Sequence, residues 1–172
     1  EIDMRIKLCI FVLVCYWLVL LGSTFNAYAD PLSLSYREAV MKHITINEGY
    51  RNDVYIDSTG NKTVGIGHKL VDQSFKVGDY INNDLIIDWF IDDITLAIKC
   101  ANKYHLSTNS NVNIVLTDMA FNLGCSGLNQ FKLLRKHLNN GNYKMAIKAI
   151  KYSNYYKQVK NRANRNISLL IK

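Results

Sequence analysis

Two carboxylates and a hydroxyl stand close together in the run NEGYRNDVYIDSTGNKTVGIGH, as Glu48, Asp57 and Thr63. Hydrolysis of a glycosidic bond needs such a set of groups. One carboxyl group donates a proton to the departing sugar oxygen, and an ionised carboxylate guides a water or supports positive charge on the sugar ring. We assign these two roles to Glu48 and Asp57, and the holding of the water to Thr63. The alternative is a polar turn without catalytic function, since Asp and Thr are common in turns.

Glu48 is expected at the end of a helix. Ser35 to Glu38 matches a capping box that would start this helix, and Gly49 suits the left-handed residue that ends it. A carboxylate at a helix C-terminus opposes the helix dipole, which suggests that Glu48 serves another purpose than helix stability. Partial removal from water at this junction would favour the protonated carboxyl group that an acid catalyst requires.

A β-hairpin is expected over residues 54–67, with a turn of about five residues between its strands. If the turn is centred on Gly60, Asp57 and Thr63 are direct cross-strand neighbours on one face. Gly65 and Gly67 follow on that face. Because they have no side chain, another group can approach the backbone closely there. On an exposed hairpin, Asp57 is expected to stay ionised.

The remainder of the chain follows a helical pattern. The apolar spacing over residues 112–123 is the most regular and predicts the central core helix, which Gly124 would end. The sequence therefore predicts an α+β fold, with a small lobe that contains a short β-hairpin sheet, a larger all-helical lobe, and a cleft between them. Besides the central helix, the larger lobe would hold helices over residues 85–104, 128–138, 143–152 and 162–170.

The N-terminal segment has the layout of a secretory signal peptide: a basic start, an apolar run and a small-x-small motif that ends at Ala29. Residues 1–29 are therefore expected to be a signal peptide or a signal-anchor segment, with residues 30–172 forming the catalytic domain. The protein would be exported to the periplasm, the cell wall or the medium. A membrane-spanning helix and a buried core helix remain alternatives for the apolar run.

The cysteines and the charge leave several possibilities open. Removal of residues 1–29 would leave Cys100 and Cys125, which either form a disulfide or stay as free thiols.

The net charge of +7 suits a polyanionic partner such as an anionic membrane or cell wall, although a basic protein without such a partner is the alternative. No nucleic-acid motif is present, so no nucleic-acid partner is expected. The histidines lack the spacing of metal ligands, and we expect neither a metal nor a cofactor.

Three segments carry a resemblance to a known family. The spacing of Glu48, Asp57, Thr63 and the following Gly-Ile-Gly-His resembles the active-site segment of phage-type lysozymes, the endolysins of glycoside hydrolase family 24. The sequences AFNLG at residues 120–124 and NRANR at residues 161–165 continue it in the same order. The resemblance extends from Tyr36 to Leu170 and implies a lysozyme-like fold.

The resemblance also implies an activity and its residues. The reaction would be hydrolysis of the β-1,4 bond between N-acetylmuramic acid and N-acetylglucosamine in peptidoglycan, without a metal or an organic cofactor. Glu48 would be the general acid, Asp57 would orient the water or stabilise the transition state, and Thr63 would position the water. The substrate-binding positions would be Phe121, Asn122 and Arg162, the last near enough to Glu48 to tune its charge.

Two further expectations concern the region after the hairpin. His68 is expected to pair with a carboxylate as a structural residue rather than to act as a catalytic base. The stretch between the hairpin and the core helix is shorter than in the best-known family members, which predicts a short or broken helix between the lobes.

Bacterial peptidoglycan is thus the expected partner, acted on by a monomer for host-cell lysis or wall degradation. Membrane contact, transient or anchored, would be made through residues 1–29. Two alternatives stay open: a noncatalytic peptidoglycan-binding protein that kept the fold, and a membrane-anchored basic protein without hydrolase activity. The presence of Glu48, Asp57 and Thr63 together argues against the first of these.

Overall fold

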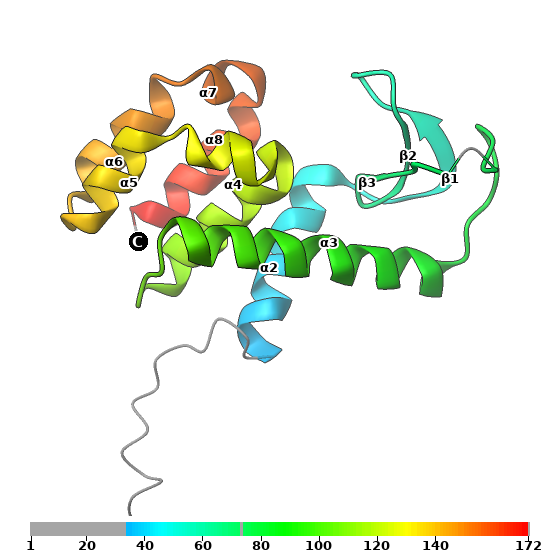
Figure 1. Ribbon diagram of the computed structural model, residues 1–172, viewed down its shortest axis with the longest axis horizontal. Helices are drawn as coiled ribbons and strands as arrows, with labels where there is room; N and C mark the ends of the chain where they lie inside the picture. The colour runs from blue at the N-terminus through cyan, green and yellow to red at the C-terminus, as the bar shows by residue number, and fades with distance from the viewer. Residues whose placement is uncertain (1–33, 73, 172) are drawn as a thin grey trace, which may run out of the picture. The chain divides into compact units, whose positions relative to one another are not determined.

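The computed structural model describes residues 34–72 and 74–171, so the predicted signal segment at residues 1–29 lies outside the described residues. The described part is mostly helical, with one small antiparallel sheet, and this confirms the α+β prediction (Figure 1). In chain order the elements are α2 (Leu34–Glu48), β1 (Arg51–Ile56), β2 (Lys62–Gly65), β3 (His68–Lys69), α3 (Asn83–Tyr104), α4 (Ser110–Asn129), α5 (Lys132–Asn139), α6 (Tyr143–Lys151), α7 (Asn154–Gln158) and α8 (Lys160–Leu170).

The small lobe is built around a three-stranded sheet in the order β1-β2-β3. The third strand begins at His68, where the sequence had suggested that the helical pattern takes over. Apolar side chains of the strands and of the following loop, namely Val54, Val64, Leu70 and Ile81, are buried together with Ile86 from the first turn of α3. This small core fixes the sheet to α3.

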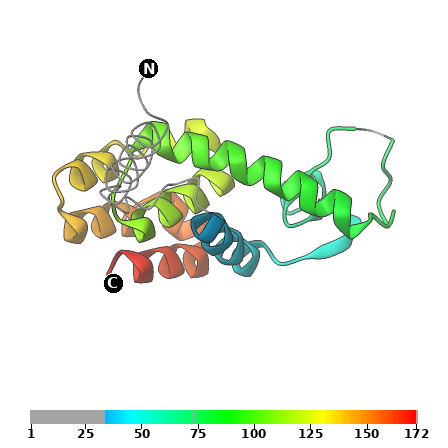
Figure 2. The ribbon, with the colours of Figure 1, turned by 90° about the horizontal axis from the view of Figure 1, so that it is seen from below.

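Helix α3 connects the two lobes (Figures 1 and 2). It is continuous over 22 residues, so the prediction of a short or broken helix is wrong. Its N-terminus is capped by the side chain of Asn82, which accepts a hydrogen bond from the backbone N–H of Asp84. Buried residues recur every three or four positions from Ile86 to Tyr104, so one stripe of the helix contributes to the cores of both lobes.

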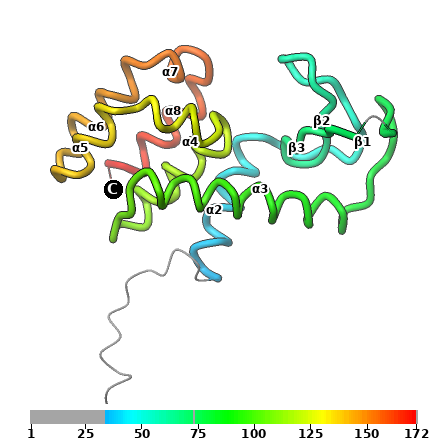
Figure 3. Tube along the Cα trace, viewed as in Figure 1, coloured from blue at the N-terminus to red at the C-terminus, as the bar shows by residue number. Residues whose placement is uncertain are grey.

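The large lobe surrounds α4, whose residues Val112, Val115, Leu116 and Met119 are almost completely buried. Helices α3 and α8 both pack on α4, and the chain reaches α8 by way of the short helices α5, α6 and α7 (Figure 3). Most of the apolar residues that these helices bury belong to one cluster. The central position predicted for the helix over residues 112–123 is therefore confirmed.

The helix boundaries differ from the prediction at several places. Helix α2 begins at Leu34, so Ser35 lies inside the helix and is not its N-cap. Gly124 adopts φ 71° and interrupts the helical path, but helical structure resumes and α4 ends at Asn129. The helix expected over residues 128–138 is thus the end of α4 followed by α5, because Phe131 between them has a non-helical ψ of 57°.

A disulfide joins Cys100 on α3 to Cys125, the residue after the break in α4. The two Cα atoms are 5.2 Å apart, within the range that a disulfide spans. The pairing that the sequence left open is therefore present. Within residues 34–72 and 74–171, no helix has the length and apolar character needed to cross a lipid bilayer.

Candidate active site

Glu48 is the last residue of α2, as predicted, and Gly49 ends the helix with φ 76°. The Glu48 side chain is 22% exposed, so it is partly withdrawn from water but remains accessible. Its Oε1 accepts a hydrogen bond from Nη1 of Arg162, which is itself buried. One oxygen of the carboxyl group is thereby fixed in place.

Arg162 is held by a second, fully buried carboxylate. Its Nε and Nη2 donate to the two oxygens of Asp118 at 2.9 and 2.8 Å, a bidentate arrangement. Asn47 and Asn166 donate to the same carboxylate at 2.8 and 2.7 Å. Burial by itself lowers the pKa of Arg162, but the charges of Asp118 and Glu48 outweigh it and raise that pKa above its ordinary value. Arg162 is therefore a permanent cation that connects the buried Asp118 to the accessible Glu48.

The position of Asp57 differs from the prediction. Tyr55 pairs with Thr63 and Ile56 pairs with Lys62, so Asp57 is not the cross-strand neighbour of Thr63. It lies in the turn beyond β1, where its backbone N–H donates to the carbonyl oxygen of Asn61 at 2.9 Å. The prediction placed the centre of the turn too far along the chain, and that error shifted the register of the whole hairpin.

The carboxylate of Asp57 caps its own turn. It accepts hydrogen bonds of 2.8 Å from the backbone N–H groups of Thr59 and Asn61, and the Thr59 hydroxyl donates to it within reach of both carboxylate oxygens. The backbone of Asn61, followed by the side chain of Thr59, lowers the pKa of Asp57 from 3.8 to about 2. Asp57 is consequently ionised throughout the neutral and mildly acidic range.

Thr63 is only 2% exposed, and its hydroxyl donates to the carbonyl oxygen of Asn61 at 3.2 Å. Burial raises the pKa of Tyr55, the cross-strand partner of Thr63. The charge of Glu48 raises that pKa further, whereas the charge of Arg51 lowers it.

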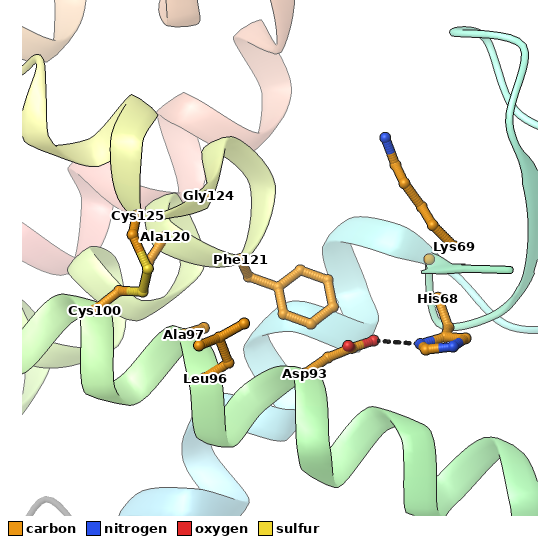
Figure 4. A pocket seen from close by; sticks show the side chains of 11 residues that line it. His68, Lys69, Asp93, Leu96, Ala97, Cys100, Ala120, Phe121, Gly124 and Cys125 are labelled. Atoms are coloured by element: carbon orange, nitrogen blue, oxygen red, sulfur yellow. Dashed lines mark hydrogen bonds and ion pairs between the residues drawn. A yellow bond between two sulfur atoms is a disulfide. The ribbon is translucent and has the colours of Figure 1, made fainter. Parts of the chain in front are cut away.

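Two pockets lie near Glu48, which lines one of them and is adjacent to Gly67 in the lining of the other. The first, the Phe121 pocket, has a volume of about 260 Å³ (Figure 4). It is lined by Gly67, His68, Lys69, Asp93, Leu96, Ala97, Cys100, Ala120, Phe121, Gly124 and Cys125. Lys69 also places its Nζ 4.0 Å from an oxygen of Asp57, which connects this pocket to the hairpin turn. We define the Glu48 pocket, of about 540 Å³, by its lining residues Asn47, Glu48, Asn122, Lys157, Gln158, Val159, Lys160, Asn161, Arg162 and Arg165.

The structure places Phe121 and Asn122 in different pockets, although the resemblance treats them as one cleft-lining pair. Successive helical residues point about 100° apart, so α4 presents one to each side. His68 lines the Phe121 pocket, and its Nδ1–H donates a 2.8 Å hydrogen bond to the carboxylate of Asp93. Its ring stacks on that of Trp89, with 4.8 Å between the ring centroids. Its predicted pairing with a carboxylate is confirmed.

Comparison with known proteins shows to which family the chain belongs. The family model for phage lysozyme matches residues 45–166. The chain belongs to the phage lysozyme family. Over 150 residues it is 26% identical to the pre-baseplate central spike protein Gp5 of Enterobacteria phage T4, covering 73% of this chain and 26% of that protein. Over 126 residues it is 25% identical to the peptidoglycan hydrolase gp36 of Pseudomonas phage phiKMV, covering 71% of this chain and 14% of that protein. The match thus spans about a quarter or less of each relative.

The two hairpin glycines have different neighbours. The sequence suggested that both leave room for a close approach to the backbone. A Cβ at Gly65 would lie 2.5 Å from Cγ2 of Ile86, so this space is filled by the small core. A Cβ at Gly67 would lie 3.2 Å from Oε2 of Glu48. Gly67 therefore gives room to the oxygen of Glu48 that Arg162 does not hold.

Replacing Gly67 with alanine is expected to lower both stability and activity. The residue has φ 76°, and an alanine in this left-handed region costs about 1–3 kcal/mol of folding free energy. Its methyl group would also displace Oε2 of Glu48. Gly78→Ala is the matched control, because Gly78 has φ 93° with no atom near its Cβ position. Thermal melts should fall for both variants, whereas wall-clearing activity should fall only for Gly67→Ala; equal activities would refute this role.

The ionisation of Asp57 can be measured directly. An NMR titration of its carboxyl carbon should give a midpoint at about 2. Because the folded pKa lies below the ordinary 3.8, Asp57 stabilises the fold fully above that value and loses this effect as pH falls through about 2. Thr59→Ala removes one donor and should move the midpoint upward, while Thr95→Ala on α3 should not. A midpoint that does not move in Thr59→Ala would contradict the proposed cause.

The sequence analysis missed Asp118, which anchors the ion pair of the site. A signal was present: Asp118 is the last acidic residue of the chain and lies within the most apolar helix. A carboxylate in a buried stripe needs a charged or hydrogen-bonding partner. Within the part of the chain that the structure describes, no cluster of three or more His, Cys, Asp or Glu side chains has a metal-binding arrangement.

Proposed function

We propose that this phage lysozyme hydrolyses the β-1,4 bond between N-acetylmuramic acid and N-acetylglucosamine in bacterial peptidoglycan. The observation that carries the proposal is the state of Glu48. One carboxyl oxygen is fixed by Arg162, and the other lies beside Gly67. Glu48 lines one pocket, and Gly67 lines the other. A substrate strand that occupies both pockets would place a sugar linkage beside this second oxygen.

The proposed mechanism gives each residue a separate role. Glu48 donates a proton from Oε2 to the departing sugar oxygen. Asp57 remains an anion and orients the attacking water or stabilises positive charge on the sugar ring. The Thr63 hydroxyl already donates to Asn61, so it would hold the water by accepting a hydrogen bond from it. Phe121 would pack against a sugar, and Asn122 would hydrogen-bond to the strand in the other pocket.

Product analysis tests the proposed bond specificity. Purified peptidoglycan is digested and then reduced with borohydride, which converts each new reducing-end sugar into its alcohol. Cleavage on the proposed side yields reduced muramic acid. Reduced glucosamine would indicate the other glycosidic bond, and new amino groups without new reducing ends would indicate a peptide or amide bond. Binding without any new reducing end would favour the noncatalytic alternative.

We also propose that the protein acts outside the cytoplasm, as a monomer, after export through residues 1–29. The Cys100–Cys125 disulfide supports an oxidising compartment. N-terminal sequencing of the exported protein decides between the two forms of export: a start at Asp30 indicates cleavage, and a start at Met4 indicates a retained anchor.

A further inference from the structure

We propose that Asp118 is a positioning residue that keeps Glu48 able to hold its proton, because it cancels the charge of the arginine that the two carboxyl groups share. Asp118 acts through Arg162 and does not touch the substrate. It thereby sets the upper end of the pH range in which the enzyme works. This inference rests on the proposed function, because it concerns the acid of the same site.

The arginine between the two carboxyl groups works against an acid catalyst. A general acid must hold its proton before the reaction begins, but a cation next to a carboxyl group favours loss of that proton. Arg162 is such a cation, since its Nη1 donates to Oε1 of Glu48. It is only 5% exposed, so water screens its charge poorly. A neighbouring anion therefore has to compensate Arg162 if Glu48 is to act as an acid.

Asp118 is placed to provide this compensation. Arg162 donates to both of its carboxylate oxygens through Nε and Nη2, and Nη2 also donates to its backbone carbonyl oxygen at 3.3 Å. Glu48 receives its hydrogen bond from the remaining nitrogen, Nη1. Burial is the largest influence on the pKa of Arg162 and lowers it, and the charge of Asp118 is the largest influence that raises it, ahead of Glu48. Arg162 and Asp118 thus form a pair without net charge, so Glu48 lies beside a dipole and not beside a free cation.

The contacts of the Asp118 carboxylate are those of an anion. It is fully buried, and Arg162, Asn47 and Asn166 all donate to it. A protonated carboxyl group would have to donate in its turn, whereas an ionised one only accepts. The amide of Asn166 is itself oriented by His43, whose Nε2 donates to its oxygen at 2.7 Å. The negative charge of Asp118 is therefore held in place from three helices, α2, α4 and α8.

The other ionisable groups around Glu48 do not take over this role. The charge of Glu48 affects the phenols of Tyr55 and Tyr155, but burial is the main cause that raises the pKa of both, and they stay neutral. On the side of Gly67, His68 is paired with Asp93. The remaining charged side chains that line the Glu48 pocket are the exposed cations Lys157, Lys160 and Arg165. They have the same sign as Arg162, and solvent and salt screen them.

The test is the dependence of kcat/KM on pH, measured from new reducing ends on soluble uncrosslinked glycan strands. The alkaline limb of this profile reports loss of the essential proton from the free enzyme. Asp118→Asn leaves Arg162 without its compensating charge, so the midpoint of this limb should move down by about one pH unit. The loss of activity should accordingly shrink toward acidic pH, where Asp57 remains ionised until the pH falls to about 2.

Asn47→Asp should move the midpoint in the opposite direction. The amide nitrogen of Asn47 lies 2.8 Å from the carboxylate of Asp118, so this variant adds a negative charge at almost the same place, next to Arg165. The exchange Asp118→Asn/Asn47→Asp keeps one carboxylate and one amide, and its midpoint should return close to that of the wild type. Opposite shifts that cancel in the exchange are expected for an effect of charge and not for disturbed packing.

The control is Asp53→Asn, which removes a carboxylate from a half-exposed arginine pair and should leave the midpoint unchanged. A loss in Asp118→Asn that is equal at every pH would overturn the proposal, as would an exchange variant whose midpoint stays at that of Asp118→Asn. If Asp118→Asn does not fold, Asn47→Asp decides, since a midpoint that does not rise in that variant refutes compensation by charge. If the wild-type enzyme produces no new reducing ends, the proposed function fails instead.

Discussion

Glu48→Gln is expected to lower the rate of wall clearing by about 10²- to 10⁴-fold, the usual contribution of a positioned general acid. Glutamine has nearly the same shape, and its carbonyl oxygen can still accept the hydrogen bond from Arg162. What it loses is the proton that the departing sugar oxygen needs. The loss should therefore appear in kcat, with KM changing little, because substrate contacts in the two pockets remain.

Glu38→Gln provides the matched control, since Glu38 is an exposed glutamate on the same helix α2. It should clear walls at the wild-type rate. Both variants should melt near the wild-type temperature, because Arg162 keeps its two hydrogen bonds to the Asp118 carboxylate. A Glu48→Gln enzyme that retains full activity would exclude Glu48 as the acid. A large fall in its melting temperature would instead indicate a structural role.

Asp118→Asn is expected to cause the largest loss of stability. Removal of one partner from a buried ion pair costs about 3–5 kcal/mol, because the remaining charge stays buried without full compensation. Here Asp118 is 0% exposed, and Arg162, Asn47 and Asn166 all donate to its carboxylate. An asparagine would offer one acceptor oxygen and add an NH₂ group among these donors. Thermal unfolding should shift down by roughly 10 °C or more.

The effect should be specific to burial and not to the loss of one negative charge. Asp53→Asn also removes a carboxylate that is paired with an arginine, but both members of the Arg51–Asp53 pair are about half exposed. Its unfolding temperature should change far less. Asp118→Asn should also lower activity, since Arg162 would no longer be held in position beside Glu48. Equal thermal shifts in the two variants would contradict the anchoring role of Asp118.

Local sequence patterns predicted much of the fold correctly. The spacing of apolar residues located α3, α6 and the start of α4 to within a few residues, because a helix with one buried face repeats every 3.6 residues wherever it packs. The same reasoning failed between Leu128 and Leu138, where apolar spacing continues across the turn at Phe131. It also missed α7, which is too short to show a period.

The hairpin shows how a small local error propagates. The sequence located the strands and the turn, but not which residues face each other. Asp57 belongs to the turn because its carboxylate accepts the N–H groups of Thr59 and Asn61, a local alternative to strand pairing. The register then places Tyr55, and not Asp57, opposite Thr63.

By itself, the sequence determined the elements and the types of chemical group near the site: an acid at the end of a helix, an anion on a hairpin and the Gly67 that follows them. These are properties of neighbouring residues, and periodicity and turn chemistry report on neighbours. Only the tertiary structure decided which groups meet. Arg162 is 114 residues from Glu48 and 44 from Asp118, and Phe121 and Asn122 diverge into separate pockets. Such contacts depend on how helices pack, because a charge becomes costly to leave unpaired only after packing has buried it.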